Sequence, residues 1–397
     1  MSNTTKTFDA VGLDAGSSWT RCVIFRLEDD RLRFLGHGSS PSQGWVRGRI
    51  TDQGAASEAM LVALREAEKN AQLSVEGAVV GVGANVRGAN CRGLLDLGRL
   101  RAVEQRDVNR AVDRATRVRL PDDVMILQLF PQDFVVDGHP GHRDPRKMIA
   151  GQIEANVHLV TTSVQEHDCL VAAVNRAHLS VEETVFEPLA ASYAAVLPED
   201  RREGAAVLNI GAQSTDLVVY YGDALQLAAS LPISGDHFTR DVARGLCISF
   251  EDAAAIKHEF GSARAGSTAE NSFVEVPSRE DRDVPRRTLN QILESRALDL
   301  FQLVRRELAR VGMEGALAGG IFLSGGGARL EGMWEMAEQE LGCRTCNALP
   351  VGIQDWPEEI YDPAWTTVAG LAMYSAKLKS QHEIERQSTG LLGRVLK

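Results

Sequence analysis

Two glycine-bearing turns, far apart in the chain, repeat one pattern that suits phosphate binding. Val11–Phe25 reads as an apolar strand, a Gly/Ser turn and a second strand, and Leu208–Tyr220 reads in the same way. Such a turn presents backbone N–H groups and hydroxyls that form a nest for an anion. One copy alone is more often only a turn, but a matched pair predicts a duplicated structure that holds one polyphosphate from both sides. The matched positions are Asp14 with Asn209, Gly16 with Gly211 and Thr20 with Thr215.

A third segment, Gly319–Met333, places three glycines, Gly325–Gly327, directly after an apolar run. Consecutive glycines let the backbone approach a ligand that any Cβ would block. We expect a helix to start after them and to add free N–H groups for an anion. A tight strand-to-helix connection without a ligand explains a lone glycine triplet equally well. Beside two phosphate-type turns, the ligand interpretation is favoured.

The first half of the chain supplies the elements that must position these turns, in an alternating α/β order. Apolar residues at helical spacing predict a helix over 54–73, and an apolar run predicts a strand over 78–83. From about 85 to 163, strand-rich sequence around one helix near 105–118 interrupts the alternation. The alternation then resumes with a helix at about 164–177, a strand at 184–187 and a helix at 188–197.

The second half begins near Gly204 with its own turn and continues in the same style. Residues 262–288 are rich in Ser, Arg, Glu and Asp around one short apolar stretch, 273–276, which predicts a mobile loop or a β-hairpin. Helical periodicity predicts helices over 236–246, over 251–260 with Ser249 as its cap, and over 289–311.

The composition is typical of a soluble, cytoplasmic protein of two or three domains. The chain has 397 residues, 44% of them hydrophobic, and a net charge of −11, which argues against nucleic acid as a partner. The first residues lack the apolar core of a signal peptide, and no apolar run reaches the ~18 residues of a membrane span. Six cysteines in a chain of this length predict no disulfide framework. Cys343 and Cys346 form the C-x-x-C spacing, and two reduced cysteines are its favoured interpretation.

The order of these features resembles the actin-like ATPase superfamily, whose members share a duplicated, ribonuclease H-like α/β fold. Within that superfamily the chain resembles the FtsA family of bacterial cell-division proteins. The resemblance covers nearly the whole chain and implies two large domains that flank a nucleotide cleft, each with a small subdomain. The segments that carry the closer resemblance are Gly36–Gly44, Pro131–Gly138, Glu154–Thr162, Phe186–Ser192 and Pro232–Thr239.

The resemblance also implies where the domains divide. The first large domain is expected at 1–84 and 164–203, with an FtsA-type inserted subdomain at 85–163. The second large domain is expected at 204–240 and 301–360, with its small subdomain at 241–300. The chain then returns to the first large domain at 361–376 and continues as a linker at 377–389 and an amphipathic, membrane-targeting tail at 390–397.

In such proteins the cleft holds ATP and Mg²⁺. Asp14 matches the acid that reaches the metal through water, because Mg²⁺ keeps several of its waters. Asn209 stands where a second Asp is usual, and Ala212 and Gln213 replace two usual glycines. An amide carries no charge and accepts no proton from an attacking water, so the chain is expected to be at most a slow ATPase. The implied nucleotide-binding residues are Asp14, Gly16, Ser17, Ser18, Gly211, Ser214, Thr215, Asp216, Gly235, Lys257, Gly325, Gly326 and Gly327.

Three of the implied site residues also have an ordinary interpretation. Glu187 matches the residue that orients the attacking water, with Asn209 as a weak second catalytic candidate, but an acid at a helix start is favoured by the helix dipole in any case. Asp216 fits the second turn, and pairing with Arg21 or a neighbouring hydroxyl explains it as well. Lys257 matches a position that contacts adenine or ribose, whereas a helical lysine is ordinarily exposed.

The resemblance implies a protein that polymerises, binds the C-terminal peptide of FtsZ, recruits later division proteins and lies on the inner face of the cell membrane at the division site. Arg286, Arg287 and Asn290 match the region used for the FtsZ peptide, and a basic patch on an acidic chain would favour an acidic partner. Capping of a helix start is the ordinary alternative. The side chains expected to contact the membrane are Leu391, Leu392, Val395 and Leu396. A frayed, disordered tail explains this segment nearly as well.

Other classes of actin-like protein fit the sequence less well. A sugar kinase should add a catalytic Asp and a substrate pocket of its own, and neither motif is found. A heat-shock ATPase would continue into a peptide-binding domain. A pilus-assembly adaptor of the PilM type shares the phosphate turns, and Pro131–Gly138 favours the FtsA family over it.

Overall fold

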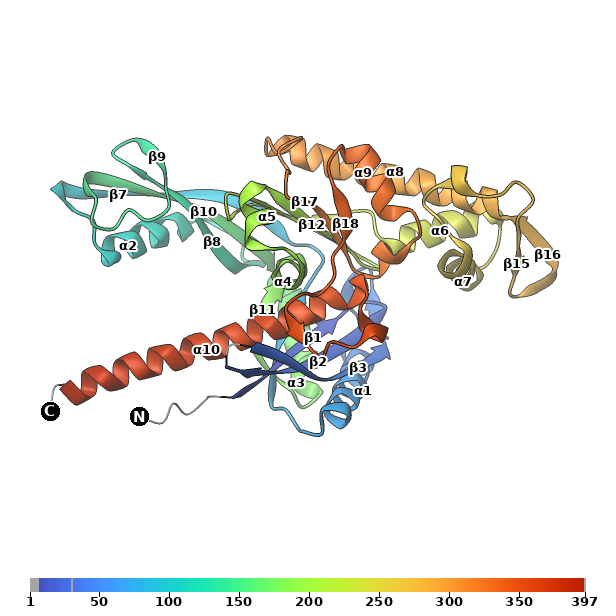
Figure 1. The fold of residues 1–397 in the computed structure, drawn as a ribbon, viewed down its shortest axis with the longest axis horizontal. Coiled ribbons are helices and arrows are strands. Elements are labelled where there is room, and N and C mark those ends of the chain that lie inside the picture. Colours follow the sequence, from blue (N-terminus) through green and yellow to red (C-terminus); the bar gives the residue numbers. More distant parts are fainter. Residues whose placement is uncertain (1–6, 30, 396–397) are drawn as a thin grey trace.

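The computed structural model describes residues 7–29 and 31–395, with the backbone alone for 279–282 and 384–395. Two large sheets organise the chain (Figure 1). The first large domain is built on a six-stranded sheet of order β11-β6-β1-β2-β3-β19. Its strands are β1 (Phe8–Ala15), β2 (Trp19–Glu28), β3 (Arg31–Pro41), β6 (Gly77–Val82), β11 (Ser180–Phe186) and β19 (Ile353–Gln354).

Helices cover both faces of this sheet, because successive side chains of a strand point to opposite faces. Val11 and Leu13 of β1 belong to one core with Met60 of helix α1, whereas Ala10 belongs to another with Val368 of helix α10. Between them, a Cβ on Gly12 would lie 2.5 Å from the backbone oxygen of Val368, so only glycine allows α10 to pack this closely. The helices of this domain are α1 (Gln53–Ala71), α3 (Val164–Arg176), α4 (Glu187–Ala195) and α10 (Thr366–Val395).

A nine-stranded sheet of order β18-β17-β12-β13-β14-β7-β10-β8-β9 runs through the second large domain and the inserted subdomain. The inserted subdomain packs helix α2 (Gln105–Thr116) on its strands and projects to one side of the molecule (Figure 1). The sequence did not predict that this subdomain joins the sheet of the second large domain, through a pairing of Ala229 with Arg87. The strands are β7 (Arg87–Ala102), β8 (Val124–Val136), β9 (His139–His142), β10 (Ile149–Ser163), β12 (Ala205–Ile210), β13 (Thr215–Tyr221), β14 (Ala224–Leu231), β17 (Gly320–Ser324) and β18 (Thr345–Asn347).

The second small subdomain lies at the opposite end of the molecule from the inserted one (Figure 1). The polar stretch before its long helix forms a hairpin of β15 (Phe273–Val276) and β16 (Arg279–Pro285), the second of the two expected alternatives. Ser249 caps α7 as predicted, accepting a hydrogen bond from Asp252 N–H. The helices are α6 (Gly235–Leu246), α7 (Phe250–Phe260) and α8 (Arg286–Arg310), the last of which crosses the expected division between residues 300 and 301.

The structure differs from the sequence-based expectation at two further places. A 3-10 turn, Gly326–Arg329, begins within the glycine triplet, and helix α9 (Met333–Leu341) begins only after a further glycine, so no α-helix starts at the triplet. Helix α10 continues without a break through the segment expected to be a linker. Among the described residues, no helix is both long and apolar enough to span a membrane.

Candidate functional site

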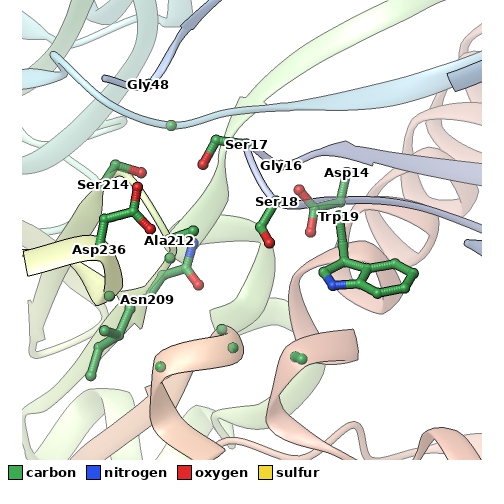
Figure 2. Close-up of a pocket in the computed structure, with 18 of the residues that line it drawn as sticks. Asp14, Gly16, Ser17, Ser18, Trp19, Gly48, Asn209, Ala212, Ser214 and Asp236 are labelled. Carbon is green, nitrogen blue, oxygen red and sulfur yellow. The ribbon is translucent and has the colours of Figure 1, made fainter. Parts of the chain in front are cut away.

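A cleft with a cavity of about 810 Å³ separates the two large domains, which is within the usual range for a small-molecule site. Figure 2 shows Asp14, Ser17 and Ser18 on one side, facing Asn209 and Ser214 on the other. The first and second turns and the glycine triplet therefore meet around one space. The predicted residues that line it are Asp14, Gly16, Ser17, Ser18, Glu187, Asn209, Gly211, Ser214, Gly235, Lys257, Gly325, Gly326 and Gly327.

The two phosphate-type turns belong to two hairpins that have the same register. In β1–β2 the second-to-last residue pair before the turn is Asp14 with Arg21, and in β12–β13 it is Asn209 with Asp216. The second turn is closed by a hydrogen bond from Gly211 N–H to Ser214 O at 2.8 Å. Because the register is the same, Asp14 and Asn209 occupy equivalent positions on opposite sides of the cleft, as the alignment of the two segments predicted.

The glycine triplet packs against the second turn. Gly325 has φ +83°, and a Cβ there would lie 2.6 Å from Asn209 Oδ1, so both its backbone angle and its surroundings require glycine. Gly326, by contrast, lines the cleft and has open space where a Cβ would be. That space is the kind that an anionic group could occupy beside exposed backbone N–H groups.

Two carboxyl groups, Asp14 and Glu187, line the base of the cleft, and a third, Asp216, is buried behind it. Burial raises the pKa of Asp14 to about 6, against the nearby charge of Arg21. Burial, together with the charges of Asp14 and Asp216, raises the pKa of Glu187 well above its ordinary value. Acids with raised pKa values in a cleft are candidates for a functional site, because a bound cation would relieve their repulsion. Within the described part of the chain, no three His, Cys, Asp or Glu side chains are grouped closely enough to hold a metal directly.

Asn209 connects the carboxyl groups to the glycine triplet's strand. Its Nδ2 donates a hydrogen bond to Glu187 Oε2 at 2.8 Å, and its Oδ1 accepts one from Ser324 Oγ at 3.3 Å. The amide therefore fixes the orientation of Glu187 at the start of α4. An aspartate at this position would have no donor for that bond.

Lys257 lies in the cleft wall and is not an ordinary surface lysine. Its Nζ donates to Thr239 Oγ1 at 2.7 Å, and burial lowers its pKa to about 8. Three arginines that were not predicted as site residues also line the cleft, Arg21, Arg49 and Arg329. The guanidinium of Arg21 lies 5.5 Å from the centre of the Trp365 ring. An arginine inside the apolar strand β2 was the signal that could have identified it.

Two predicted nucleotide contacts do not line the cleft. Thr215 and Asp216 are fully buried in strand β13, behind the turn. Asp216 accepts hydrogen bonds from Ser230 Oγ and from Ala84 N–H, the latter at 3.3 Å, and it is not paired with Arg21. The alternative of a neighbouring hydroxyl is therefore correct for Asp216. Thr215 and Asp216 both match the residue types of a phosphate-binding turn, but they lie in the strand behind that turn. The pattern of residue types therefore wrongly predicted that they contact the nucleotide.

Gln213, in place of a usual glycine, reaches across the cleft. Its Oε1 accepts a hydrogen bond from Gly48 N–H of the first large domain at 2.9 Å. Gly48 lies in the short connection between β4 (Trp45–Val46) and β5 (Arg49–Ile50). A glycine at 213 would leave these two sides of the cleft without this bond.

The three residues expected to bind a partner peptide have unequal exposure. Asn290 is fully buried and holds the preceding loop, accepting from Ser262 N–H at 2.8 Å and donating to Thr268 Oγ1 at 2.7 Å. Arg286 donates to Phe260 O at 2.8 Å at the end of α7. Only Arg287 is largely exposed, paired with the exposed Glu270 at 3.0 Å. The assignment of Asn290 to a partner contact is therefore wrong, because its side chain has no accessible surface.

The expected membrane-contacting side chains lie outside the described residues. The backbone of Leu391, Leu392 and Val395 belongs to α10, but their side chains, and all of Leu396, are not described. None of the six cysteines, all of which the structure describes, forms a disulfide, and Cys343 and Cys346 pack against different cores, which agrees with two reduced cysteines.

Solved structures of actin-like proteins share this fold. The chain aligns over 92% of its length with the PilM–PilN type IV pilus biogenesis complex, at a TM-score of 0.67 and 19% identity, covering 98% of that chain. MreB5 of Spiroplasma citri bound to AMPPNP aligns over 96% of this chain and 99% of its own, at a TM-score of 0.57 and 13% identity. At these identities the likeness establishes the duplicated actin-like fold alone.

Sequence comparisons are more specific. The family model of cell division protein FtsA matches residues 206–370, and that of the SHS2 domain inserted in FtsA matches residues 83–161. FtsA of Pseudomonas aeruginosa is 32% identical over 93% of this chain and 90% of its own length. FtsA of Escherichia coli K12 is 30% identical over 98% of this chain and 95% of its own. With its inserted subdomain and its duplicated phosphate turns, the chain belongs to the FtsA family of cell-division proteins.

Proposed function

We propose that this protein binds ATP with Mg²⁺ in the cleft and, in that state, polymerises and tethers the FtsZ ring to the cytoplasmic membrane. The observation that carries the nucleotide part is the meeting of three glycine-bearing turns around one cavity that also encloses Asp14 and Glu187. The turns suit phosphate groups, and the carboxyl groups suit the water shell of a hard cation. AMPPNP bound to the MreB5 neighbour supports the same assignment.

The residues present fit such a ligand. Gly326 leaves open space beside the turns, and Lys257, Arg21 and Arg329 add positive charge to the walls of the cleft. Mg²⁺ would lie near Asp14, through water, and would offset the charge of the phosphates. Glu187, held by Asn209 at 2.8 Å, would orient a water near the terminal phosphate. Because Asn209 supplies no second charge, we expect slow or absent hydrolysis.

A valine at Gly326 tests the nucleotide site without disturbing the fold. A Cβ at this position meets nothing within 4 Å, so the fold should accept the larger side chain, which would then occupy the space proposed for phosphate. We expect Gly326→Val to weaken ATP binding, measured by calorimetry with Mg²⁺, by at least about a hundredfold, or roughly 2.7 kcal/mol.

The matched control is Gly266→Val. Gly266 also lies in a short 3-10 segment with nothing within 4 Å of its Cβ position, and it does not line the cleft. It should bind ATP like the unchanged protein. Absence of ATP binding by the unchanged protein at millimolar concentration, or equal binding by Gly326→Val, would overturn the nucleotide assignment.

The remaining parts of the proposal rest on membership of the FtsA family. They are self-association into filaments, binding of the FtsZ C-terminal peptide, recruitment of later division proteins and a peripheral position on the inner face of the membrane. Of the proposed peptide-binding residues, Arg287 stays the candidate because its guanidinium is accessible. Arg286 and Asn290 would support that surface rather than form it.

A further inference from the structure

The chain enters the inserted subdomain through a strained joint beside the cleft. Ala84 and Asn85 have φ values of 58° and 52°, two consecutive non-glycine residues in the left-handed region. This conformation is unfavourable for an alanine in particular, and it persists only where the surrounding structure holds it. The joint connects the end of β6 with the start of β7, and Gly83 and Ala84 line the cleft.

Asp216 is the group that holds this joint. One carboxylate oxygen accepts a hydrogen bond from Ala84 N–H at 3.3 Å, and the other accepts one from Ser230 Oγ. Ser230 Oγ in turn accepts a hydrogen bond from Val86 N–H at 2.9 Å, and Ser230 N–H donates to Val86 O at 3.0 Å. The carboxylate therefore fixes the backbone on both sides of Asn85.

The hydrogen bonds continue from the joint into the inserted subdomain. Ala229, next to Ser230, pairs with Arg87 of β7, and Arg87 O accepts a hydrogen bond from Thr161 Oγ1 of β10 at 3.0 Å. Farther along, Gln132 Nε2 of β8 donates to Leu225 O of β14 at 2.7 Å. The inserted subdomain is thus hydrogen-bonded to the strand that carries Ser230, although it is inserted in the sequence of the first large domain.

The same carboxylate is directly connected to the second phosphate turn. Asp216 pairs with Asn209 across the hairpin, and the side chain of Ser214, which lines the cleft, lies near enough to lower the pKa of Asp216. Asp216 itself is fully buried and does not face the cleft. It can therefore respond to a ligand only through the turn on one side and Ala84 on the other.

We propose that Asp216 is a positioning residue that locks the Ala84–Asn85 joint, and that a nucleotide in the cleft acts on this lock and so sets the orientation of the inserted subdomain. The second part rests on the proposed nucleotide site. Both ends of the lock, Ser214 and Ala84, line the cleft. A ligand that contacts them differently in two arrangements of the joint shifts the balance between those arrangements.

Hydrogen exchange on the full-length chain without nucleotide tests the lock. Asp216→Asn removes the charge and one of the two acceptor oxygens, so the bonds to Ala84 N–H and Ser230 Oγ are weakened, and Ser230→Ala provides a milder second variant if the first folds poorly. We expect exchange of the amides in 83–92 to become about tenfold faster, as a weakening equivalent to the loss of one hydrogen bond permits. Unchanged exchange at the joint in both variants would overturn the lock.

The matched control is Asp107→Asn. Asp107 is also a fully buried carboxylate, held by Arg101 at 2.6 Å and by Glu104 N–H at 3.0 Å, but it lies within the inserted subdomain and away from the joint. This variant should speed up exchange around α2 and leave the joint unchanged. Equal loosening of 83–92 in the control would show that Asp216 acts through general stability and not through the joint.

The same measurement with ATP and Mg²⁺ tests the coupling. In the unchanged protein, ATP should alter exchange over 83–102 and 149–163. Asp216→Asn should abolish most of this change. Its ATP affinity, measured by calorimetry, should stay within about threefold of that of the unchanged protein. An ATP response of equal size in the variant would overturn the coupling and leave the lock. Absence of ATP binding in every variant would overturn the nucleotide site and the coupling together, whereas the nucleotide-free result would still decide the lock.

Discussion

Asn209 differs from an aspartate by one charge, and that charge would lie beside carboxyl groups whose pKa values are already raised. In the structure its amide donates to Glu187, so the group that would orient a water is held by a neutral partner. We expect Asn209→Asp to raise ATP turnover with Mg²⁺ above that of the unchanged protein, because a second acid would then face the metal waters. Steady-state phosphate release measures this. Turnover of about 1 s⁻¹ or more in the unchanged protein would contradict our account of Asn209.

Asn209→Ala is the control, since it removes the same hydrogen bond without adding a charge, and it should not gain turnover. Thermal unfolding measured against pH shows whether the new side chain in Asn209→Asp is ionised in the folded protein. An ionised side chain at position 209 would raise the pKa of Glu187 further above the ordinary 4.5. A carboxyl group with a raised pKa in the folded state contributes stability that is fully present below its unfolded pKa and is lost as the pH rises through the folded value. Nucleotide-free Asn209→Asp should therefore lose stability relative to the unchanged protein between pH 4.5 and neutrality.

At the scale of elements, the sequence predicted those features that depend on neighbouring residues in the chain. The paired turns, helices α1 and α7 and the cap at Ser249 follow from spacing and residue type, and the structure confirms them. Contacts between distant segments could not be obtained in this way. The pairing of β14 with β7 and the burial of Asp216 and Asn290 depend on which surfaces meet, and a short polar side chain has the same pattern whether it binds a ligand or a neighbouring backbone group.

The start of helix α8 shows how exposure changes a prediction. A charge reversal at Arg286 would also disturb the end of α7, because this arginine donates to Phe260 O. Arg287 is the cleaner choice, since its ion pair with Glu270 is exposed and such pairs contribute little to stability. We expect Arg287→Glu to weaken binding of an acidic FtsZ C-terminal peptide by at least about tenfold, measured by fluorescence anisotropy at low salt.

Arg306→Glu provides the comparison for this variant. Arg306 is an exposed arginine on the same helix, and its reversal changes the net charge of the protein equally. It should leave peptide binding and ATP affinity unchanged. If Arg306→Glu weakens the peptide as much as Arg287→Glu does, the attraction is a property of overall charge and the peptide binds elsewhere.

On the scale of the whole molecule, helix α10 begins against the sheet of the first large domain and runs to the C-terminal end of the described chain. Its first turns pack under β1, and Lys379 still reaches Glu182 at 2.9 Å and Asp9 O at 2.8 Å. Figure 1 shows the helix then leaving the body toward the side of the inserted subdomain. A helix of 30 residues is roughly 45 Å long. The tail is therefore carried on a continuous helix, where a polar linker was expected.

That arrangement bears on how the tail would contact a membrane. Burial of Leu391, Leu392, Val395 and Leu396 would contribute at most ~1.5–3 kcal/mol each, and ordering a short end that contains glycines removes several kcal/mol of this total. The remainder would bind a monomer weakly and a polymer firmly, because linked tails bind with a high effective concentration. We expect pelleting with anionic vesicles to rise steeply with protein concentration, to depend on ATP and to disappear on deletion of 390–397. A point variant that keeps the length, Leu392→Glu, should match the deletion, whereas strong binding of dilute monomer or binding that survives both changes would place the membrane contact elsewhere.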